Sequence, residues 1–376
     1  MVEERYDVAV VGAGMLGAAA AYRLACAGRR VLLIEAHEPA SGTTGNSFAW
    51  VNAVSKEPES YHRLNAAGAT EYAALVEELG EDSGYRGDGS LGWADAADEQ
   101  VAIRDRVTRL AARGYAAEWI TPDAARRLEP GLAIGPEVEG VAFYPGDGWV
   151  DAPRLVRALV NHALAEGADL WRNTAVASVR RNGDRITGLV TARGTVTADE
   201  VLFCVGIWTA EVLAHAGVSL PVGRSPGLLA VTSVPTAPLG RVVHAPGIHL
   251  RPDVSGGLLL GADDTDALTT EQTPPGEPPA YALPLMERAA RVFPAAADAR
   301  IVSVRIGIRP MPADRLTIAG RVPGVANAWV LATHSGITMG PLLGRLLAAE
   351  IVGAPADPLL RDFRPDRFRR LSGAEK

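Results

Sequence analysis

Lysine and cysteine are both rare in this 376-residue chain, with two of each. The cysteines, Cys26 and Cys204, cannot build a disulfide framework, and neither has a partner at metal-ligand spacing. We therefore expect no metal site, interpret both cysteines as small core residues, and predict a reducing, cytoplasmic location. Of the 37 basic residues only Lys56 and Lys376 are lysines, so arginine carries almost every cationic role.

The chain also lacks an excess of positive charge and a long uninterrupted apolar run. Its formal net charge of −7 repels phosphate backbones and anionic lipid, which argues against a nucleic-acid partner. The longest apolar stretch, residues 8–21, is broken by glycines and preceded by Glu3 and Glu4, where a signal peptide needs positive charge. No other segment approaches the roughly 18 apolar residues of a membrane span. We expect neither an export signal nor a transmembrane helix.

What is present begins with a complete β-α-β unit. Residues 6–11 form an apolar run, followed by Gly12-x-Gly14-x-x-Gly17, an alanine-rich helix, and a second apolar run that ends at Glu35. In such a unit the glycines permit a tight turn, backbone approach to a pyrophosphate, and close helix packing, while the acid accepts from ribose hydroxyls. The order of strand, glycines, helix, second strand and acid predicts an ADP-dinucleotide site. The alternative, a turn that only packs a helix on a sheet, leaves the position of Glu35 unexplained.

The loop after Glu35 favours FAD over NAD. Residues 39–47 read Pro-Ala-Ser-Gly-Thr-Thr-Gly-Asn-Ser, rich in hydroxyls and glycine, where an NAD-binding domain would soon enter its next strand. Small donors of this kind can wrap a pyrophosphate and reach an isoalloxazine ring. A solvated surface loop is the alternative interpretation.

The run DVAVVGAGMLGAAAAYRLACAGRRVLLIEA at 7–36, with SGTTGNS at 41–47, resembles the FAD-dependent D-amino-acid oxidase superfamily, which contains glycine oxidase, sarcosine oxidase and D-amino-acid dehydrogenases. Two later segments extend the resemblance. One is a helix at 152–167 with Asp151 as its N-cap, and the other is the run EVLFCVGIW at 200–208, which matches the family's returning strand beside the flavin.

The resemblance implies a mixed α/β fold of the glutathione-reductase-like, D-amino-acid-oxidase type. A Rossmann-type FAD-binding domain would comprise residues 1–85, 145–215 and 312–376, and an antiparallel-sheet substrate domain residues 86–144 and 216–311. The active site would lie in the cleft between them. The residues implied for the FAD site are Gly12, Gly14, Met15, Gly17, Glu35, Ala36, Ser41, Thr43, Thr44, Asn46, Ser47, Val176, Gly206, Trp208, Gly336, Ile337, Thr338 and Met339.

Residues 305–320, RIGIRPMPADRLTIAG, resemble the family's strand and loop in which an arginine binds the substrate carboxylate, and this assigns that role to Arg309. A guanidinium suits the task because its rigid fork gives two parallel charge-assisted hydrogen bonds and stays ionised at any working pH. Arg305, four residues earlier on the same face of the expected strand, is a second candidate.

Residues 331–341, LATHSGITMGP, predict a strand whose glycine-bearing turn opens a helix with its positive end toward the flavin N1/C2=O edge. The resemblance puts His334 where glycine oxidase carries a second arginine, and His249 where relatives place a pocket tyrosine. The alternatives are an imidazole satisfied by backbone carbonyls for His334 and a solvent-facing strand residue for His249. We expect Phe48 or Trp50 in the substrate pocket, with domain-interface packing as the alternative.

Two departures from the family pattern affect the chemistry. No cysteine follows Cys204 and no histidine lies between Ala40 and Trp50, which are the regions where relatives tether the flavin, so we expect non-covalent FAD. Neither Lys56 nor Lys376 lies in the motif of the lysine that assists oxygen near flavin N5. Oxygen activation would then need an arginine, His334 or water.

The activity implied is oxidation of the C–N bond of a small amino acid or secondary amine to an imine, by hydride transfer to flavin N5 and then hydrolysis. One alternative is a dehydrogenase with the same chemistry that passes electrons to a quinone or partner subunit rather than to O2. Another is a flavin-holding subunit without turnover. The expected partners are the amine or amino acid, O2 or another acceptor, and a second copy of the chain if it forms a homo-oligomer.

Overall fold

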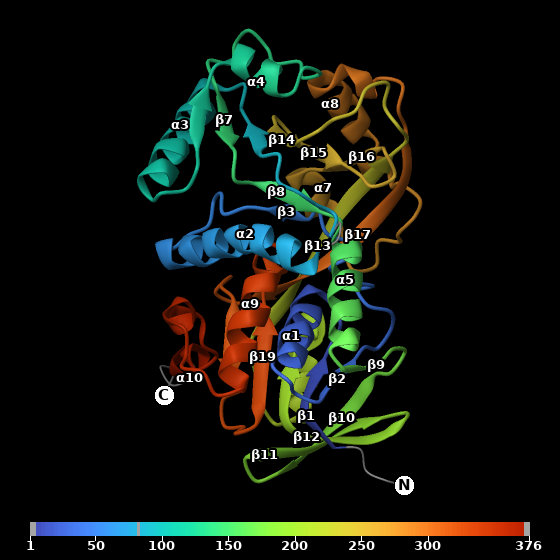
Figure 1. The fold of residues 1–376 in the computed structure, drawn as a ribbon. Coiled ribbons are helices and arrows are strands. Elements are labelled where there is room, and N and C mark those ends of the chain that lie inside the picture. The colour runs from blue at the N-terminus through green and yellow to red at the C-terminus, as the bar shows by residue number, and fades with distance from the viewer. Residues whose placement is uncertain (1–4, 81–82, 372–376) are drawn as a thin grey trace.

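The computed structural model describes residues 5–80 and 83–371 and arranges them in two lobes (Figure 1). The lower lobe contains a sheet whose central strands β9-β2-β1-β12-β19 run parallel, with β10 and β11 added to β12, and β18 to β19, in antiparallel pairs. Its strands are β1 (Arg5–Val11), β2 (Val31–Ile34), β9 (Asp169–Trp171), β10 (Val176–Asn182), β11 (Arg185–Thr191), β12 (Gly194–Phe203), β18 (Ile318–Arg321) and β19 (Ala328–Ala332).

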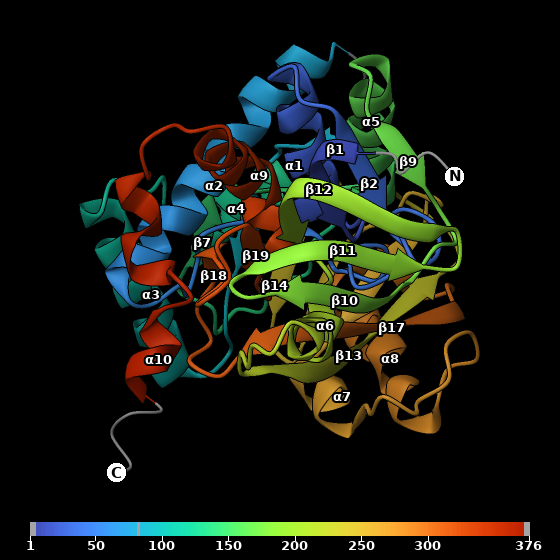
Figure 2. The ribbon, with the colours of Figure 1, turned by 90° about the horizontal axis from the view of Figure 1, so that it is seen from below.

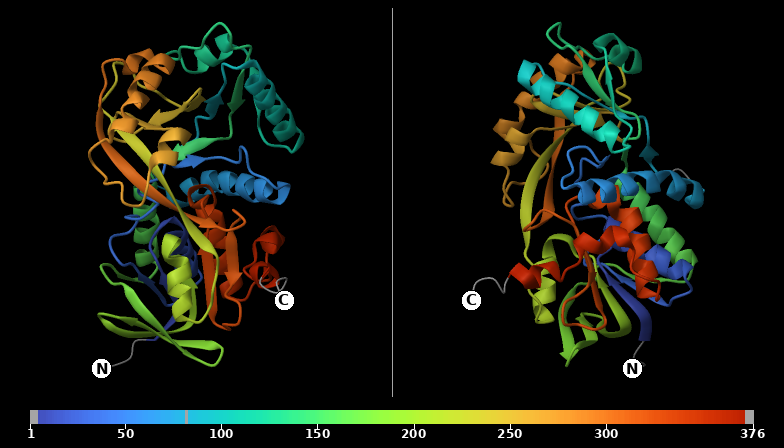
Figure 3. Two further views of the ribbon diagram at one scale, coloured as in Figure 1. Left: turned by 180° about the vertical axis from the view of Figure 1, so that it is seen from behind. Right: turned by 90° about the vertical axis from the view of Figure 1, so that its left-hand side faces the viewer.

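The upper lobe contains a second sheet in the order β17-β13-β16-β15-β14-β5-β7-β6, antiparallel apart from the β14–β5 pair. Its two longest strands, β13 and β17, pair along most of their length and extend down to the lower lobe (Figure 3). The strands are β5 (Ser90–Gly92), β6 (Glu118–Ile120), β7 (Val141–Tyr144), β13 (Val222–Thr232), β14 (Val242–Ala245), β15 (Ile248–Pro252), β16 (Leu258–Gly261) and β17 (Ile301–Pro312).

A small sheet and a long helix lie at the junction of the lobes. The sheet is β3 (Trp50–Val51), β8 (Gly148–Val150) and β4 (Tyr85–Arg86), and the helix is α2 (Glu59–Leu79). The remaining helices are α1 (Met15–Cys26), α3 (Ala97–Ala112), α4 (Pro122–Leu128), α5 (Ala152–Ala165), α6 (Thr209–His215), α7 (Asp263–Leu268), α8 (Pro284–Val292), α9 (Gly336–Ile351) and α10 (Arg367–Leu371).

Helix α1 packs between α5 and α9 on one face of the parallel sheet (Figures 1 and 2). Gly344 of α9 allows this close approach, because a Cβ added there would lie 2.7 Å from the Cβ of Ala19. Helix α5 begins as expected, with the Asp151 carboxylate accepting from the Arg154 backbone N–H at 3.2 Å. Helix α5 buries Leu155, Val156, Leu159, Val160 and Ala163, whereas Leu164 near its end is 41% exposed.

The mixed α/β fold predicted from the sequence is confirmed, with one largely parallel and one largely antiparallel sheet. The parallel sheet takes its strands from residues 5–34, 169–203 and 318–332, and the antiparallel sheet from residues 90–144 and 222–312. The domain boundaries themselves stay a prediction. Lys376 lies outside the described residues, and every helix within the described ranges is too short or too polar to span a bilayer.

Candidate active site

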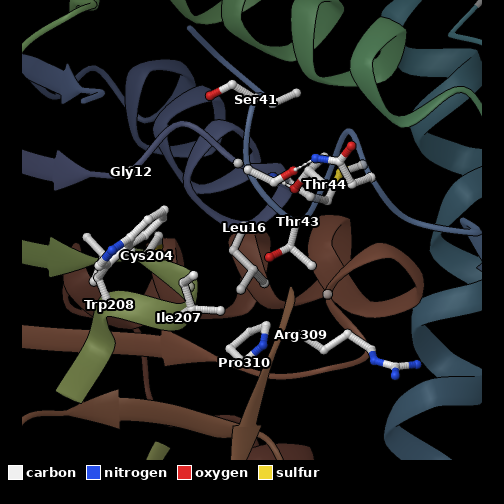
Figure 4. Close-up of a pocket in the computed structure, with 18 of the residues that line it drawn as sticks. Gly12, Leu16, Ser41, Thr43, Thr44, Cys204, Ile207, Trp208, Arg309 and Pro310 are labelled. Atoms are coloured by element: carbon white, nitrogen blue, oxygen red, sulfur yellow. Dashed lines mark hydrogen bonds between the residues drawn. The ribbon is translucent and has the colours of Figure 1, made fainter. Parts of the chain in front are cut away.

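A cavity of about 840 Å³ is lined by residues from both lobes. Its volume lies within the range of about 300–1,000 Å³ that is usual for ligand and cofactor sites. Figure 4 shows part of the wall, with Thr43 and Thr44 on one side, Trp208 on the other, and Leu16 between them. Most residues predicted for the site line it, namely Gly12, Gly14, Met15, Glu35, Ala36, Ser41, Thr43, Thr44, Asn46, Ser47, Val176, Gly206, Trp208, His249, Arg309, His334, Gly336 and Ile337.

Three predicted residues lie behind this wall. Gly17 packs against the turn before it, since a Cβ there would lie 1.8 Å from the Gly12 carbonyl oxygen. Thr338 is buried and donates its hydroxyl to the Trp50 carbonyl at 3.2 Å. Met339 is fully buried in the core, where it packs against Gly68 of α2. These side chains shape the cavity from behind rather than face its contents.

The turn between β1 and α1 brings backbone to the cavity wall. Gly12 has φ +99°, and its N–H donates to the Ile34 carbonyl at 2.7 Å. A Cβ there would lie 2.4 Å from the Cys204 carbonyl oxygen, so only glycine fits between β1 and β12. Gly14 then begins α1 with no side-chain cap, which leaves a helix N-terminus facing the cavity and suited to bind phosphate.

Glu35 is fixed at the end of β2 by backbone donors. One carboxylate oxygen accepts from the Ala13 N–H at 2.7 Å and the other from the His37 N–H at 2.9 Å. Both oxygens keep lone pairs that can accept from a ligand hydroxyl. The carboxylate therefore lines the cavity in one orientation, as a ribose contact requires.

The loop at 40–48 is held between α1 and β17. The Thr44 hydroxyl oxygen accepts from the Met15 N–H at 3.1 Å, and the Thr43 hydroxyl donates to the Ile308 carbonyl at 2.5 Å. Gly307 approaches the loop so closely that a Cβ would lie 2.4 Å from the Asn46 carbonyl oxygen. The interpretation of this loop as solvated surface is wrong, because its residues close one side of the cavity.

Arg309 lies on β17 opposite Ser225 of β13. Its Nη2 donates to the Asp266 carboxylate at 2.9 Å and to the Pro226 carbonyl at 3.1 Å, while Nε donates to the Ser225 carbonyl at 3.3 Å. Within the described residues Nη1 has no hydrogen-bond partner, so part of the guanidinium remains available to a ligand. Arg305 instead pairs with the buried Asp253 at 3.1 Å. Among the described residues, Arg305 is not one of those that line the cavity.

His249 and His334 line the same cavity as Arg309. The His249 ring packs edge-on against Phe48 at 5.0 Å between centroids, and burial lowers the pKa of His249. The interpretation of His249 as solvent-facing is therefore wrong. Burial and the nearby cations lower the pKa of His334 to about 4, and its Nδ1 is buried without a partner among the described residues. Both imidazoles are neutral at pH 7.

Trp50 is anchored away from the cavity while Phe48 lies on its wall. The Trp50 indole N–H donates to the Asp147 carboxylate at 3.0 Å, and that carboxylate also accepts from Ser90 at 2.7 Å and from the Tyr115 hydroxyl. Burial raises the pKa of Asp147 to about 7, against the opposing effect of these donors. The network links the upper lobe to the loop that carries Phe48.

Two residues to which the sequence analysis gave no role in the site lie in it or next to it. Asp266, on α7, lines the cavity and pairs with Arg309 from 43 positions away. The Lys56 ammonium lies 3.3 Å from the hydroxyl oxygen of Ser335. The two neighbours of Ser335 in the sequence, His334 and Gly336, line the cavity. No spacing in the sequence indicates either contact, because each joins segments that only the tertiary fold brings together.

The cysteines differ from each other in environment. Cys204 lies on the cavity wall behind Gly12, and burial raises the pKa of its thiol. Cys26 is exposed at the last position of α1, so its assignment to the core is wrong. Cys26 lies where the helix ends, directly before the exposed residues 27–30. Among the described residues no group of three His, Cys, Asp or Glu side chains is arranged to hold a metal ion.

The sequence is similar to those of known proteins over most of its length. A family model described as "FAD dependent oxidoreductase" matches residues 7–350. The sequence is 32% identical over 357 residues to a glycine oxidase of Geobacillus kaustophilus strain HTA426, with 93% of each chain covered. It is 26% identical to an opine oxidase subunit of Agrobacterium tumefaciens strain Ach5, over 96% of this chain and 97% of that protein.

Solved structures with the same fold cover nearly the whole chain. The crystal structure of glycine oxidase from Geobacillus kaustophilus superposes with a TM-score of 0.86 at 31% identity, over 96% of this chain and 99% of that one. The iminodiacetate oxidase of Chelativorans sp. BNC1 gives a TM-score of 0.84 at 27% identity, over 95% and 98% of the two chains.

Proposed function

The chain belongs to the DAO family of FAD-dependent oxidoreductases, and on this basis we propose that it oxidises a small amino acid or secondary amine to the imine, which water then hydrolyses. At the coarser level it is a glycine-oxidase-like enzyme that uses FAD and acts on the C–N bond of an amino acid or amine. The substrate, the path of the hydride and the electron acceptor are parts of the proposal.

The cavity residues fit FAD. The tight turn at Gly12, the start of α1 after the side-chain-free Gly14, and the fixed Glu35 carboxylate suit a pyrophosphate followed by a ribose. At the other end, α9 begins at Gly336 without a side-chain cap, and its N–H groups suit the electron-rich edge of a flavin ring. When bound, FAD supplies the chemistry of accepting a hydride from the substrate carbon.

We propose that the FAD is held without a covalent bond. Cys204 is the one described cysteine on the wall, and its raised pKa keeps the thiol protonated and unreactive. Precipitation with acid should release the yellow colour into the supernatant. Colour that stays with the pelleted protein would contradict this part of the proposal.

The observation that carries the proposal is the free Nη1 of Arg309 in the same cavity as the Gly12 turn. A carboxylate bound to this guanidinium fixes one end of a small amino acid, so that its α C–H can be oriented for transfer. Most of the catalytic contribution of the protein would then be orientation, because the substrate is small and Arg309 is held on the paired strands β13 and β17.

The reacting amine must be neutral, and Asp266, the carboxylate beside Arg309, is already engaged by hydrogen bonds. It accepts from Arg309 and from the Leu228 N–H at 2.9 Å. His249 and His334 have lowered pKa values and do not retain a proton at neutral pH. The ammonium proton would therefore pass to water before the C–H bond breaks.

An anaerobic panel of amines tests the proposal. Glycine, sarcosine and short D- and L-amino acids are mixed with FAD-loaded protein, and reduction is read as loss of the flavin absorption band. We expect at least one carboxylate-bearing amine to reduce the flavin and the matching amine without a carboxylate to fail. Failure of the whole panel would favour a subunit that only holds flavin.

The electron acceptor is a separate question with its own readout. Oxidase activity would release peroxide in air in proportion to amine consumed, whereas a dehydrogenase would turn over only with an added quinone or dye. The similarity to a protein named as one subunit of an opine oxidase supports testing the second route alongside the first.

A further inference from the structure

Lys56 is a partly buried cation without a counter-charge. Its ammonium donates to the Ser335 hydroxyl oxygen at 3.3 Å, and the Tyr61 hydroxyl donates to the same oxygen at 3.0 Å. No carboxylate pairs with Lys56 among the described residues. This contrasts with Arg309, whose charge is offset by Asp266 at 2.9 Å. Because an unpaired charge is costly to bury, the arrangement favours an anion that arrives with a ligand.

The charged groups around His334 are also positive. The charged groups that act on this imidazole are Lys56, Arg315 and Arg309, all of them cations, and together with burial they lower the pKa of His334 to about 4. Its Nδ1 is buried without a partner among the described residues, so an N–H or a lone pair at this position is unused. A neutral imidazole that meets an anion can donate to it.

We propose that Lys56 and His334 form a second anion subsite, and that the substrate is an amine bearing one carboxylate for Arg309 and a second for this subsite. The inference rests on the proposed function, because it takes Arg309 as the site of the first carboxylate. His334 and Arg309 line one cavity, and the Lys56 ammonium lies 3.3 Å from the hydroxyl oxygen of Ser335, the residue next to His334. Both cations act on the His334 imidazole, so a small anionic ligand bound beside that imidazole would meet the charge of both. The substrate class is an amino dicarboxylate or an imino dicarboxylate.

The test uses two ligands that differ in one carboxylate and cannot be oxidised as amines, thiodiacetate and methylthioacetate. Binding to the FAD-loaded protein is read from the perturbation of the flavin absorption band. We expect the protein to bind thiodiacetate more tightly by about tenfold or more, which is the effect of one charge-assisted hydrogen bond. Lys56→Met should bring the two affinities close together, and Lys56→Arg should retain the preference.

Arg63→Met is the matched control, because it removes one cation from α2 that is exposed and paired with Glu59 at 3.0 Å. It should leave the preference unchanged. Equal preference in the wild-type protein and in Lys56→Met would overturn the proposal. A changed flavin reduction potential in Lys56→Met with an unchanged preference would also overturn it, because Lys56 would then serve the cofactor.

A pH series adds a readout that a structural role would not move. Burial and Arg315 lower the pKa of Lys56 to about 8, so the preference for thiodiacetate should fall as pH rises above that value. The other groups facing Lys56 are the His334 imidazole and the Ser335 and Tyr61 hydroxyls. The sulfur analogues carry no amine, so their own charge is constant across this range.

The two proposals can fail separately. If sarcosine reduces the flavin but thiodiacetate shows no preference that depends on Lys56, the subsite is wrong and the proposed function stands. If thiodiacetate shows the preference but no amine reduces the flavin, the subsite stands and the proposed function is wrong. Iminodiacetate, which is sarcosine with a second carboxylate, should reduce the flavin at lower concentration than sarcosine when both proposals hold.

Discussion

Arg309 and Asp266 form an ion pair on the wall of the cavity, with Nη2 of the arginine 2.9 Å from Oδ2 of the aspartate. The pair joins β17 to α7, and two backbone carbonyls of β13 accept from the same Nη2 and from the adjacent Nε. Asp266 is itself fixed by the Leu228 N–H at 2.9 Å. The arginine is therefore oriented before a ligand arrives, which lowers the entropy lost on binding.

Arg309→Leu should raise the KM for the amine substrate by about a hundredfold, because the substrate carboxylate loses its charge-assisted hydrogen bonds. FAD content should stay at the wild-type level. Steady-state kinetics measure the effect, and Arg305→Leu is the control from the same strand, since Arg305 pairs with Asp253. An unchanged KM in Arg309→Leu would remove this residue from the substrate site.

Asp266→Asn should raise KM by about three- to tenfold with a smaller change in kcat. The amide can still accept from Leu228, but it no longer holds the guanidinium by charge, so Arg309 becomes less well oriented. Asp266 is a positioning residue in this account. Tighter substrate binding in Asp266→Asn would mean that the aspartate competes with the substrate carboxylate instead.

Gly12→Ala should abolish FAD binding, because its Cβ would lie 2.4 Å from the Cys204 carbonyl oxygen and the turn would have to move. Gly28→Ala is the matched control. Gly28 also has positive φ, at +71°, but no heavy atom lies within 4 Å of its Cβ position. It should lose about 1 kcal/mol of stability from backbone strain and keep its FAD. Similar FAD loss in both variants would show that close contact is not the cause.

The acid dependence of stability should reflect His334 and His244. Their pKa values of about 4 and about 3 lie below the ordinary histidine value of about 6.5. At pH values below about 6.5 and above the lowered pKa of each histidine, the unfolded chain binds protons that the folded chain does not. The free energy of unfolding therefore falls as the pH drops through this range. The maximum slope is about 1.4 kcal/mol per pH unit for one histidine.

Urea unfolding of the wild-type protein and His334→Gln at pH 7 and pH 5 measures this effect. The variant should lose less stability on acidification than the wild-type protein, while the contribution of His244 remains in both. An identical loss in the two proteins would show that His334 titrates normally in the folded state.

The predictions that the structure and the relatives support came from local sequence motifs. Gly12, Gly14 and Glu35 lie within one β-α-β unit, so sequence spacing alone fixes their relation to one another. Family membership, the mixed α/β fold and the use of FAD are confirmed. The roles of Arg309, His249 and His334 stay predictions, although all three lie on the cavity wall.

Contacts between distant segments could not be predicted in this way. Lys56 meets Ser335 across 279 positions, and the reason is the position of the loop before α2 beside the start of α9. The exposed Cys26 shows a related limit, since an apolar helix indicates burial on average but not at which of its residues burial ends. Thr338 and Met339 belong to a helix whose start lines the cavity while their own side chains turn into the core.

The most direct test of the central claim is the FAD content of the purified protein after incubation with excess FAD and gel filtration. The account predicts one FAD per chain, a visible flavin absorption band, and loss of both in Gly12→Ala. A wild-type protein that stays colourless would contradict the assignment of the cavity between the Gly12 turn and Arg309.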